Sequence, residues 1–332
     1  MSSETIRSHS KAGFHQFFRD WALVIAIIAG VAGYFAYISI HVLDDTHAIM
    51  LRLAEVLQPV LIFTMLFLSF CNISLHDIRP CGWSASLILF QTLAFVVIGI
   101  ILIFLPHNGW RVVLEGAMIC FICPTATAAA VITKRLGGSM AHIATYTILI
   151  NIVAAIVIPI MVPFIYPRPG VHILNTMMVI MGKVFPLLLL PLILALLVRK
   201  LYPTLHRKLI SRPNLPFNIW VIALVIALAM TTRSIVHSQV SAQARLGIVA
   251  VSLGCCLFQF WLGRRIGARY RDKITAGQAL GQKNTIFAIW LGFTFFSPVT
   301  AIAGGFYCIW HNLVNSRQLY SHDHKEVQRV MN

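Results

Sequence analysis

Apolar stretches long enough to cross a lipid bilayer recur along the whole chain. A transmembrane helix needs about 20 mostly apolar residues. The 332-residue sequence is 58% hydrophobic and only 11% charged, whereas soluble domains carry about 25% charged residues. A soluble protein of this size has no core large enough for so much apolar surface, but lipid accepts it. The sequence therefore predicts an all-α polytopic membrane protein with short loops and no soluble domain.

We predict ten transmembrane helices in two sets of five. An N-terminal segment (1–20) precedes them, an external loop (166–172) joins the halves 21–165 and 173–316, and a tail (317–332) follows. The expected spans are 21–42, 54–73, 84–105, 112–134, 140–165, 173–199, 216–237, 243–264, 273–292 and 295–316.

The basic residues predict the orientation. If the N-terminus is cytoplasmic, nineteen of the 26 lysines and arginines fall on the inner side and five on the outer side. Lys183 and Lys283 fall within spans. Such a bias in short loops sets the topology of membrane proteins, so both termini are expected in the cytoplasm. The expected location is a bacterial-type inner membrane. The same distribution explains the net charge of +16 by contact with anionic lipid, and we expect no nucleic-acid partner.

Each half contains five spans, and the fourth span of each half has the least lipid-like sequence. Because five is odd, the second half must enter the membrane in the opposite orientation. This layout is typical of inverted-repeat secondary transporters, and we expect a 5+5 inverted repeat.

Span four is expected to break near its centre. Pro124 removes a backbone donor and clashes with the preceding turn. Small and hydroxylic residues follow it, including Thr125, Thr127, Ala129 and Ala130. A helix broken at the midplane, with another segment passing close by, needs such residues. A tightly packed, kinked helix is the structural alternative.

Span nine places a charge near the membrane midplane. A lysine at the bilayer centre costs about 2.5–3.5 kcal/mol on insertion scales, and it is tolerated where it faces a cavity, a partner or a bound anion. The alternative is a structural pairing with an acid or with carbonyl groups. The candidate site residues of this span are Gln278, Gly281 (at the expected break), Gln282, Lys283, Asn284 and Thr285.

Other polar residues receive structural interpretations. Glu115 is expected to pair with Arg111 one turn earlier, although a proton-carrying role stays open. Lys183 is expected to reach the interface. The cysteines, including the pair Cys120 and Cys123, are interpreted as small apolar residues. The sequence His322-Asp323-His324 is interpreted as a solvated tail, and we predict no metal site and no cofactor.

Four segments resemble the bile acid:sodium symporter family. They are 120–138 (CFICPTATAAAVITKRLGG), 281–284 (GQKN), 309–312 (IWHN) and 71–80 (CNISLHDIRP). The resemblance covers nearly all ten spans. It implies a panel of spans 1, 2, 6 and 7 that rocks against a core of spans 3–5 and 8–10, with broken helices crossing at the core. It also implies a functional monomer, and organic anions such as bile acids or small carboxylates as substrates.

The sequence departs from that family at the positions of its sodium ligands. Thr147 keeps such a ligand, and Gln91 keeps another if the alignment to the family is shifted by one residue. The positions that have lost theirs are Ala129, Ala130, Ile143, Ala279 and Lys283. We hypothesise that Lys283 occupies a vacated cation position, with amide and carbonyl oxygens around its ammonium. Na⁺ coupling is then not expected, and proton coupling follows if Lys283 loses its proton in one state.

The expected function is secondary transport of an organic anion by alternating access, with two half-helix N-termini and Lys283 favouring an anion. A sodium-coupled symporter that uses the remaining ligands and a transport-inactive receptor or regulator stay open as alternatives. A channel is disfavoured by the short loops. An intramembrane enzyme is disfavoured because the spans carry no recognisable catalytic arrangement, so no catalytic residue is predicted.

Overall fold

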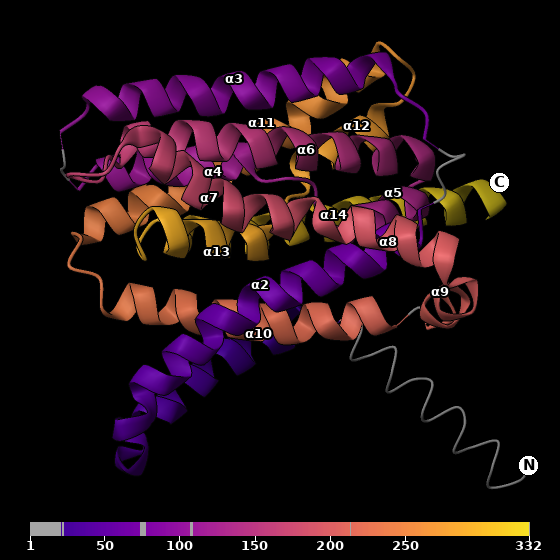
Figure 1. Cartoon of the computed structure of the whole chain (residues 1–332). Coiled ribbons are helices and arrows are strands. Elements are labelled where there is room, and N and C mark those ends of the chain that lie inside the picture. The colour runs from indigo at the N-terminus through magenta and orange to yellow at the C-terminus, as the bar shows by residue number, and fades with distance from the viewer. Residues whose placement is uncertain (1–20, 22, 74–77, 107–108, 213, 332) are drawn as a thin grey trace, which may run out of the picture.

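The computed structural model describes residue 21 and residues 23–73, 78–106, 109–212 and 214–331. These residues form helices and connecting loops, with one isolated β-bridge between Thr125 and Lys283 (Figure 1). After an apolar helix at Leu23–Ile38, the elements are η1 (His41–Thr46), α2 (His47–Cys71), α3 (Gly82–Phe104), α4 (Arg111–Ile122), α5 (Ala129–Arg135), α6 (Met140–Ile165), α7 (Ile173–Leu188), α8 (Leu190–Leu201), α9 (Pro203–Ile210), α10 (Leu215–Val236), α11 (Ala242–Ala268), α12 (Lys273–Gly281), α13 (Thr285–Phe295) and α14 (Ala301–Met331).

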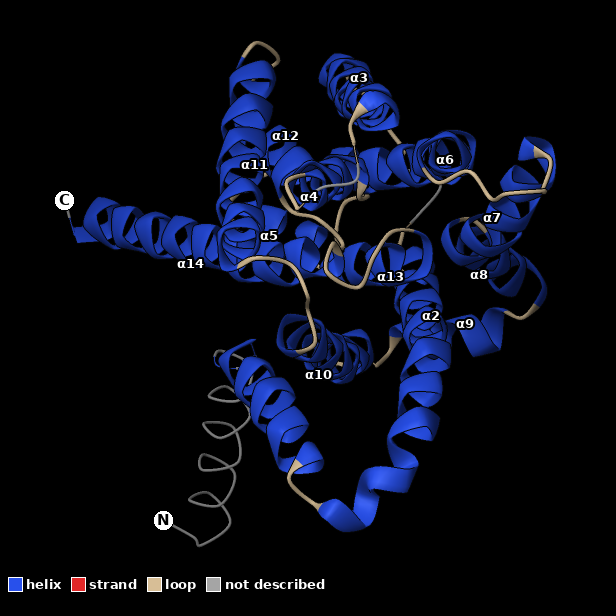
Figure 2. Ribbon diagram, turned by 90° about the vertical axis from the view of Figure 1, so that its left-hand side faces the viewer, coloured by secondary structure: helices blue, strands red, loops and turns tan. Residues whose placement is uncertain are grey.

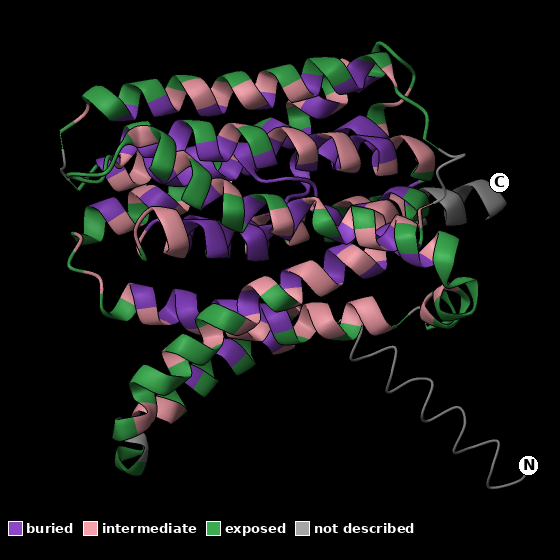
Figure 3. Ribbon diagram, in the orientation of Figure 1, coloured by how far each residue is buried: buried purple, intermediate pink, exposed green. Residues whose placement is uncertain are grey.

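The all-α membrane class is confirmed. Five of the described helices are long and apolar enough to cross a membrane, namely α2, α3, α6, α10 and α11. The pair α7 and α8 makes a sixth candidate with a bend of 40° between its halves. Many large apolar side chains are exposed on the outside of the bundle, and Figure 3 shows exposed residues along the outer helices. Lipid is the environment that such a surface requires.

Several element boundaries differ from the expected ones. The span predicted at 173–199 is bent, because Pro186 and Pro191 flank the junction at Leu189 and proline interrupts the helical hydrogen-bond ladder. The expected inner loop after it contains α9, in which no residue is buried and Arg207 and Lys208 stand in the last turn. The tail predicted at 317–332 continues α14 as far as Met331. The N-terminal segment 1–20 lies outside the described residues.

The helices fall into two groups by packing (Figure 2). In the larger group, α3, α4, α6, α11, α12 and α14 pack against one another, and α13 packs along α14. In the smaller group, α2 packs against α8 and α10. The helix Leu23–Ile38 contacts α10, since Ala26 shares a buried cluster with Leu224 and Leu228. The groups meet where α13 contacts α2 and α10 and where α10 contacts α14. α7 links them, because it packs against α6 of the larger group and against α2 and α8 of the smaller one.

Glycines let α11 and α12 approach closely within the larger group. A Cβ at Gly263 would overlap the carbonyl group of Ala276, and one at Gly267 would overlap the Cβ of Ala276. Small residues of this kind permit backbone-to-backbone packing in membranes. The approach fixes α12, whose residues Thr275 to Gly281 are all buried.

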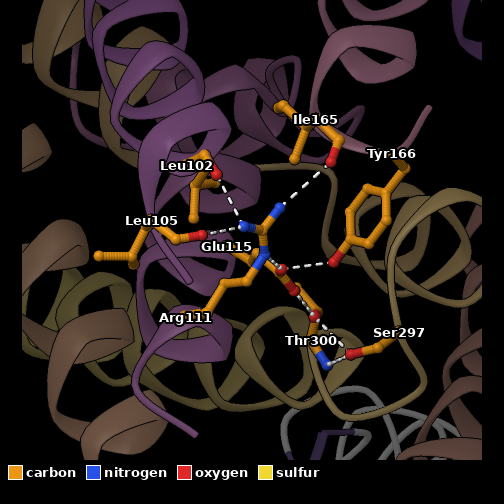
Figure 4. A network of polar contacts seen from close by, with 8 residues as sticks. All are labelled: Leu102, Leu105, Arg111, Glu115, Ile165, Tyr166, Ser297 and Thr300. Atoms are coloured by element: carbon orange, nitrogen blue, oxygen red, sulfur yellow. Dashed lines mark hydrogen bonds and ion pairs between the residues drawn. The ribbon is translucent and has the colours of Figure 1, made fainter. Parts of the chain in front are cut away.

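A buried ion pair holds together one end of the larger group (Figure 4). Arg111 donates from Nε to Glu115 Oε1 at 3.1 Å. The other guanidinium nitrogens donate to the backbone carbonyls of Leu102, Leu105 and Ile165. The pairing of Arg111 with Glu115 one turn apart was expected, and it is confirmed.

The Glu115 carboxylate also has two neutral donors. The hydroxyls of Tyr166 and Thr300 both donate to it, and Glu115 and Arg111 are 1% and 3% exposed. The network therefore joins the ends of α3, α4 and α6 to the loop before α14, and all the partners are inside the protein.

Glu115→Gln should strongly destabilise the protein. The change leaves a buried guanidinium without its counter-charge, and breaking a buried pair in this way costs about 3–5 kcal/mol. Chemical unfolding in detergent measures the difference in unfolding free energy. Glu55→Gln on the exposed face of α2 is the matched control and should change the free energy by about 0.5 kcal/mol or less. Equal effects of the two changes would contradict the structural role of the pair.

Candidate functional site

Two interrupted helices cross near the centre of the larger group. Residues 123–128 separate α4 from α5, and residues 282–284 separate α12 from α13. The two interruptions lie side by side. The Ala126 amide donates to the Gln282 carbonyl at 2.9 Å, and the Asn284 amide donates to the Pro124 carbonyl at 2.8 Å. Each interruption thus supplies hydrogen bonds that the other has lost.

Local chemistry explains where α4 and α12 end. Pro124 has no amide hydrogen to continue the helical ladder. Gly281 is the last residue of α12, and a Cβ there would overlap the Phe260 ring. The carbonyl freed at Gly281 accepts from the Tyr307 hydroxyl at 2.8 Å. The carbonyl of Ala279 accepts from the Thr125 hydroxyl at 2.7 Å.

Lys283 lies at the crossing and is 1% exposed. Its Nζ donates to Gln91 Oε1 at 2.8 Å and to the Phe121 carbonyl at 3.2 Å. Both acceptors are uncharged, and within the described part of the chain no carboxylate forms an ion pair with this ammonium. The lysine is therefore a buried amine that is held by uncharged oxygens.

Gln91 orients that contact from α3. Its Nε2 donates to the carbonyls of Ile122 and Cys123, each at 3.1 Å. Its Oε1 accepts from the Tyr146 hydroxyl at 3.1 Å as well as from Lys283. The amide is thus held by the end of α4 on one side, and its oxygen is presented to two donors on the other.

A cavity of about 30 Å³ adjoins the crossing, where the two helix groups meet. This volume holds about two water molecules. Two buried polar atoms of its lining, Gln282 Oε1 and His311 Nδ1, have no hydrogen-bond partner among the described residues. The lining consists of Met65, Ala126, Thr127, Ala128, Trp220, Gln282, Lys283, Asn284, Thr285, Ile286, His311 and Asn312.

The first turn of α13 forms part of this cavity. Asn284 caps the helix, with its side-chain oxygen accepting from the Phe287 amide at 3.2 Å. Thr285 and Ile286 of the first turn belong to the lining. The N-terminus of a helix carries a partial positive charge, so α13 directs that charge toward the cavity beside Lys283.

Of the residues predicted from sequence, five line the cavity, namely Thr127, Gln282, Lys283, Asn284 and Thr285. Thr125 and Gln91 lie behind it and bond the crossing. The remaining ones lie elsewhere. Gln278 donates to Asn315 and Gln318 of α14. Thr147 donates to the Ile143 carbonyl of its own helix. Ala129 belongs to a buried apolar cluster, and Ala130 packs against that cluster.

Sequence reasoning did not assign Met65, Trp220, His311 or Asn312 to the site, although the structure places them in the cavity lining. His311 and Asn312 lie in the IWHN segment of α14, which carried part of the family resemblance. That segment could have identified them. Met65 of α2 and Trp220 of α10 come from apolar spans, and nothing in their local sequence distinguishes them.

The pairing of Lys283 with Gln91 should appear as energetic coupling. Gln91→Leu leaves a buried donor without its acceptor and should cost about 1–3 kcal/mol of unfolding free energy. Combined with Lys283→Met, the loss should be smaller than the sum of the two single losses by about 0.5–3 kcal/mol. Chemical unfolding of all four proteins in detergent measures the cycle. Gln278→Leu is the matched control, since its amide contacts α14, and it should add to Lys283→Met without coupling. Additive losses for Gln91 and Lys283 would contradict a direct bond.

Comparison with known proteins supplies the family. No curated protein matches the chain. Residues 60–311 match the SBF-like CPA transporter family (DUF4137), and that range runs from within α2 to His311 and includes both interrupted helix pairs. This match confirms the resemblance to bile acid:sodium symporter-like proteins, and the chain belongs to the SBF-like CPA transporter family.

Proposed function

We propose that this protein is a secondary transporter that moves a small organic anion by alternating access. The observation that carries the proposal is the Lys283 ammonium at the helix crossing, buried and bonded to uncharged oxygens. A charge in this position favours an anionic ligand. The cavity beside it lies between the two groups of helices, where relative movement of the groups would expose it to either side.

The proposed architecture is a ten-span 5+5 inverted repeat. Taken in chain order, the interrupted pairs α4–α5 and α12–α13 would be the fourth span of each half. The smaller group would be the panel, and the larger group the core. Figure 1 supports cytoplasmic termini, because α5, α9 and the C-terminal end of α14, which carry many of the basic residues, lie at one end of the bundle. We propose a bacterial-type inner membrane for this topology and a monomer as the working unit.

Within the organic-anion class, we favour a small carboxylate over a bile acid. The cavity of about 30 Å³ is far smaller than the clefts of about 300–1,000 Å³ that enclose drug-sized ligands. A carboxylate could accept from the amides at the N-terminus of α13 and from His311. A protonated carboxyl or a hydroxyl on the ligand could donate to Gln282. A sterol-sized ligand would require the two helix groups to separate.

We propose that transport does not require sodium. Na⁺ needs several oxygen ligands, but Ala129, Ala130 and Ala279 offer none from their side chains. The Thr147 hydroxyl is engaged within its own helix. Lys283 brings a tethered positive charge to the oxygen of Gln91, the residue expected to survive from the family's sodium site. A second cation in contact with that oxygen would be repelled.

A transport-inactive receptor is the second candidate, favoured by the loss of side-chain oxygens at Ala129, Ala130 and Ala279. It would retain ligand binding without solute flux. We propose no catalytic role, because family membership points to transport.

The expected flux is independent of sodium and dependent on Lys283. Purified protein in liposomes should take up a radiolabelled small carboxylate equally well in sodium and potassium buffers, because the tethered ammonium replaces the ion. Lys283→Gln should reduce uptake at least about tenfold, the effect of about 1.4 kcal/mol. The matched control is Lys183→Gln, since Lys183 is exposed on α7 with its Nζ 5.9 Å from the Phe295 ring centroid.

The outcomes separate the candidates. Sodium-dependent uptake that persists unchanged in Lys283→Gln would contradict the replacement of sodium by Lys283. Thermal stabilisation by a carboxylate without any flux would favour the receptor. Uptake of taurocholate rather than of small carboxylates would overturn the proposed substrate size.

A further inference from the structure

A cysteine, a histidine and an aspartate from three separate elements converge at one end of the larger helix group. Cys81 precedes α3, His142 lies in the first turn of α6, and Asp272 precedes α12. Their potential ligand atoms all lie within 4.8 Å of one another. The three segments are far apart in sequence, so the tertiary fold brings these residues together.

Asp272 is held in this cluster and does not cap its own helix. An aspartate at an N-cap position normally accepts from amides of the first turn, but the side chain of Asp272 makes no such bond. Its Oδ2 lies 2.7 Å from His142 Nδ1 and accepts from the buried Trp83 indole at 3.0 Å. Arg271 before it has a φ of 57°, a left-handed conformation that is uncommon outside glycine and costs of order 1–3 kcal/mol.

We propose that Cys81, His142 and Asp272 bind a zinc-class divalent ion, with water as the fourth ligand. A thiolate, an imidazole and a carboxylate are the side-chain ligands that Zn²⁺ prefers. A sulfur ligand selects zinc over Mg²⁺ or Ca²⁺. The deprotonated thiol and the carboxylate together carry two negative charges, which balance the ion beside the basic residues Arg271 and Lys273.

The geometry needs only small adjustments. Metal–ligand bonds of about 2.0–2.3 Å in a tetrahedron place nitrogen and oxygen ligands about 3.3 Å apart and sulfur about 3.6 Å from either. The His142–Asp272 contact at 2.7 Å would open slightly. The sulfur lies within 4.8 Å of both other ligand atoms, so it would close in by about 1.2 Å at most. All three residues are partly exposed, so an ion can enter from solution.

A catalytic role of the cysteine is a weaker interpretation of the same cluster. Burial and the neighbouring Asp272 carboxylate raise the pKa of the Cys81 thiol, whereas a nucleophilic cysteine needs a lowered one. Metal coordination supplies the positive charge that would stabilise the thiolate. The proposal does not depend on which solute is carried.

A bound ion would join the start of α12 to α3 and α6. Trp83, which bonds Asp272, packs against Tyr146 with ring centroids 5.6 Å apart, and Tyr146 bonds Gln91 beside Lys283. The site would therefore brace one end of the half-helix that leads to the crossing.

Cobalt titration of the purified, tag-free protein in detergent tests the site. Co²⁺ should produce a near-ultraviolet thiolate-to-cobalt absorption band that saturates at one equivalent of Co²⁺ per protein. Zn²⁺ should displace that band and raise the thermal unfolding midpoint, since a ligand that binds only the folded state stabilises it. Cys81→Ser should abolish the band. His142→Gln and Asp272→Asn should weaken binding. Asp272→Asn keeps a side-chain oxygen that can accept from Trp83, so it still tests the site if Cys81→Ser fails to fold.

Matched controls locate the ion. Cys308→Ser alters a buried thiol elsewhere and should leave the band intact. The double change His322→Ala and His324→Ala removes the histidines near the C-terminus and should also leave it intact. The proposal is overturned if the wild-type protein shows no thiolate band. It is likewise overturned if the band survives Cys81→Ser or disappears with the C-terminal histidines.

Discussion

Backbone amide and carbonyl groups inside a bilayer have no water to bond to, and this constraint governs the centre of the molecule. An interrupted helix at membrane depth leaves such groups unpaired, at a cost of several kcal/mol each. Here the two interruptions satisfy each other through the Ala126–Gln282 and Asn284–Pro124 hydrogen bonds. Each break depends on the other for these bonds, so we expect α4–α5 and α12–α13 to form as a pair. The close packing of α11 on α12 and the hydroxyls of Thr125 and Tyr307 complete that requirement.

The buried charge depends on the same crossing. Where the helices are interrupted, carbonyl groups that a continuous ladder would use become available, and Lys283 uses the one at Phe121 together with the Gln91 amide. An ammonium so placed pulls the end of α4 toward α3. It also raises the electrostatic potential of the neighbouring cavity. One side chain thus holds the crossing together and, in the proposed function, also favours an anion next to it.

Part of this arrangement could be predicted from the sequence because it has local causes. The length of the apolar stretches predicts membrane helices. Pro124 and Gly281 lie where the helical hydrogen-bond ladders of α4 and α12 stop. Spacing predicts the Arg111–Glu115 pair. Features that depend on tertiary packing could not be predicted in this way. The Lys283–Gln91 bond joins residues 192 positions apart, and only the family resemblance suggested that both belong to one site. Gln278, a candidate by its position in span nine, instead faces α14, because helical rotation decides the direction of a side chain.

A tethered ammonium has a consequence for the energetics of a carrier. A sodium ion that accompanies an anion crosses the membrane and is released, so its gradient drives the solute. Lys283 cannot leave, and it stays with the protein in every state. Each monovalent anion that crosses would then carry its full charge through the field, worth about 2.3 kcal/mol per 100 mV. In a cell whose interior is negative, that term favours outward movement, and accumulation inside would need a proton or a steep external supply of the anion.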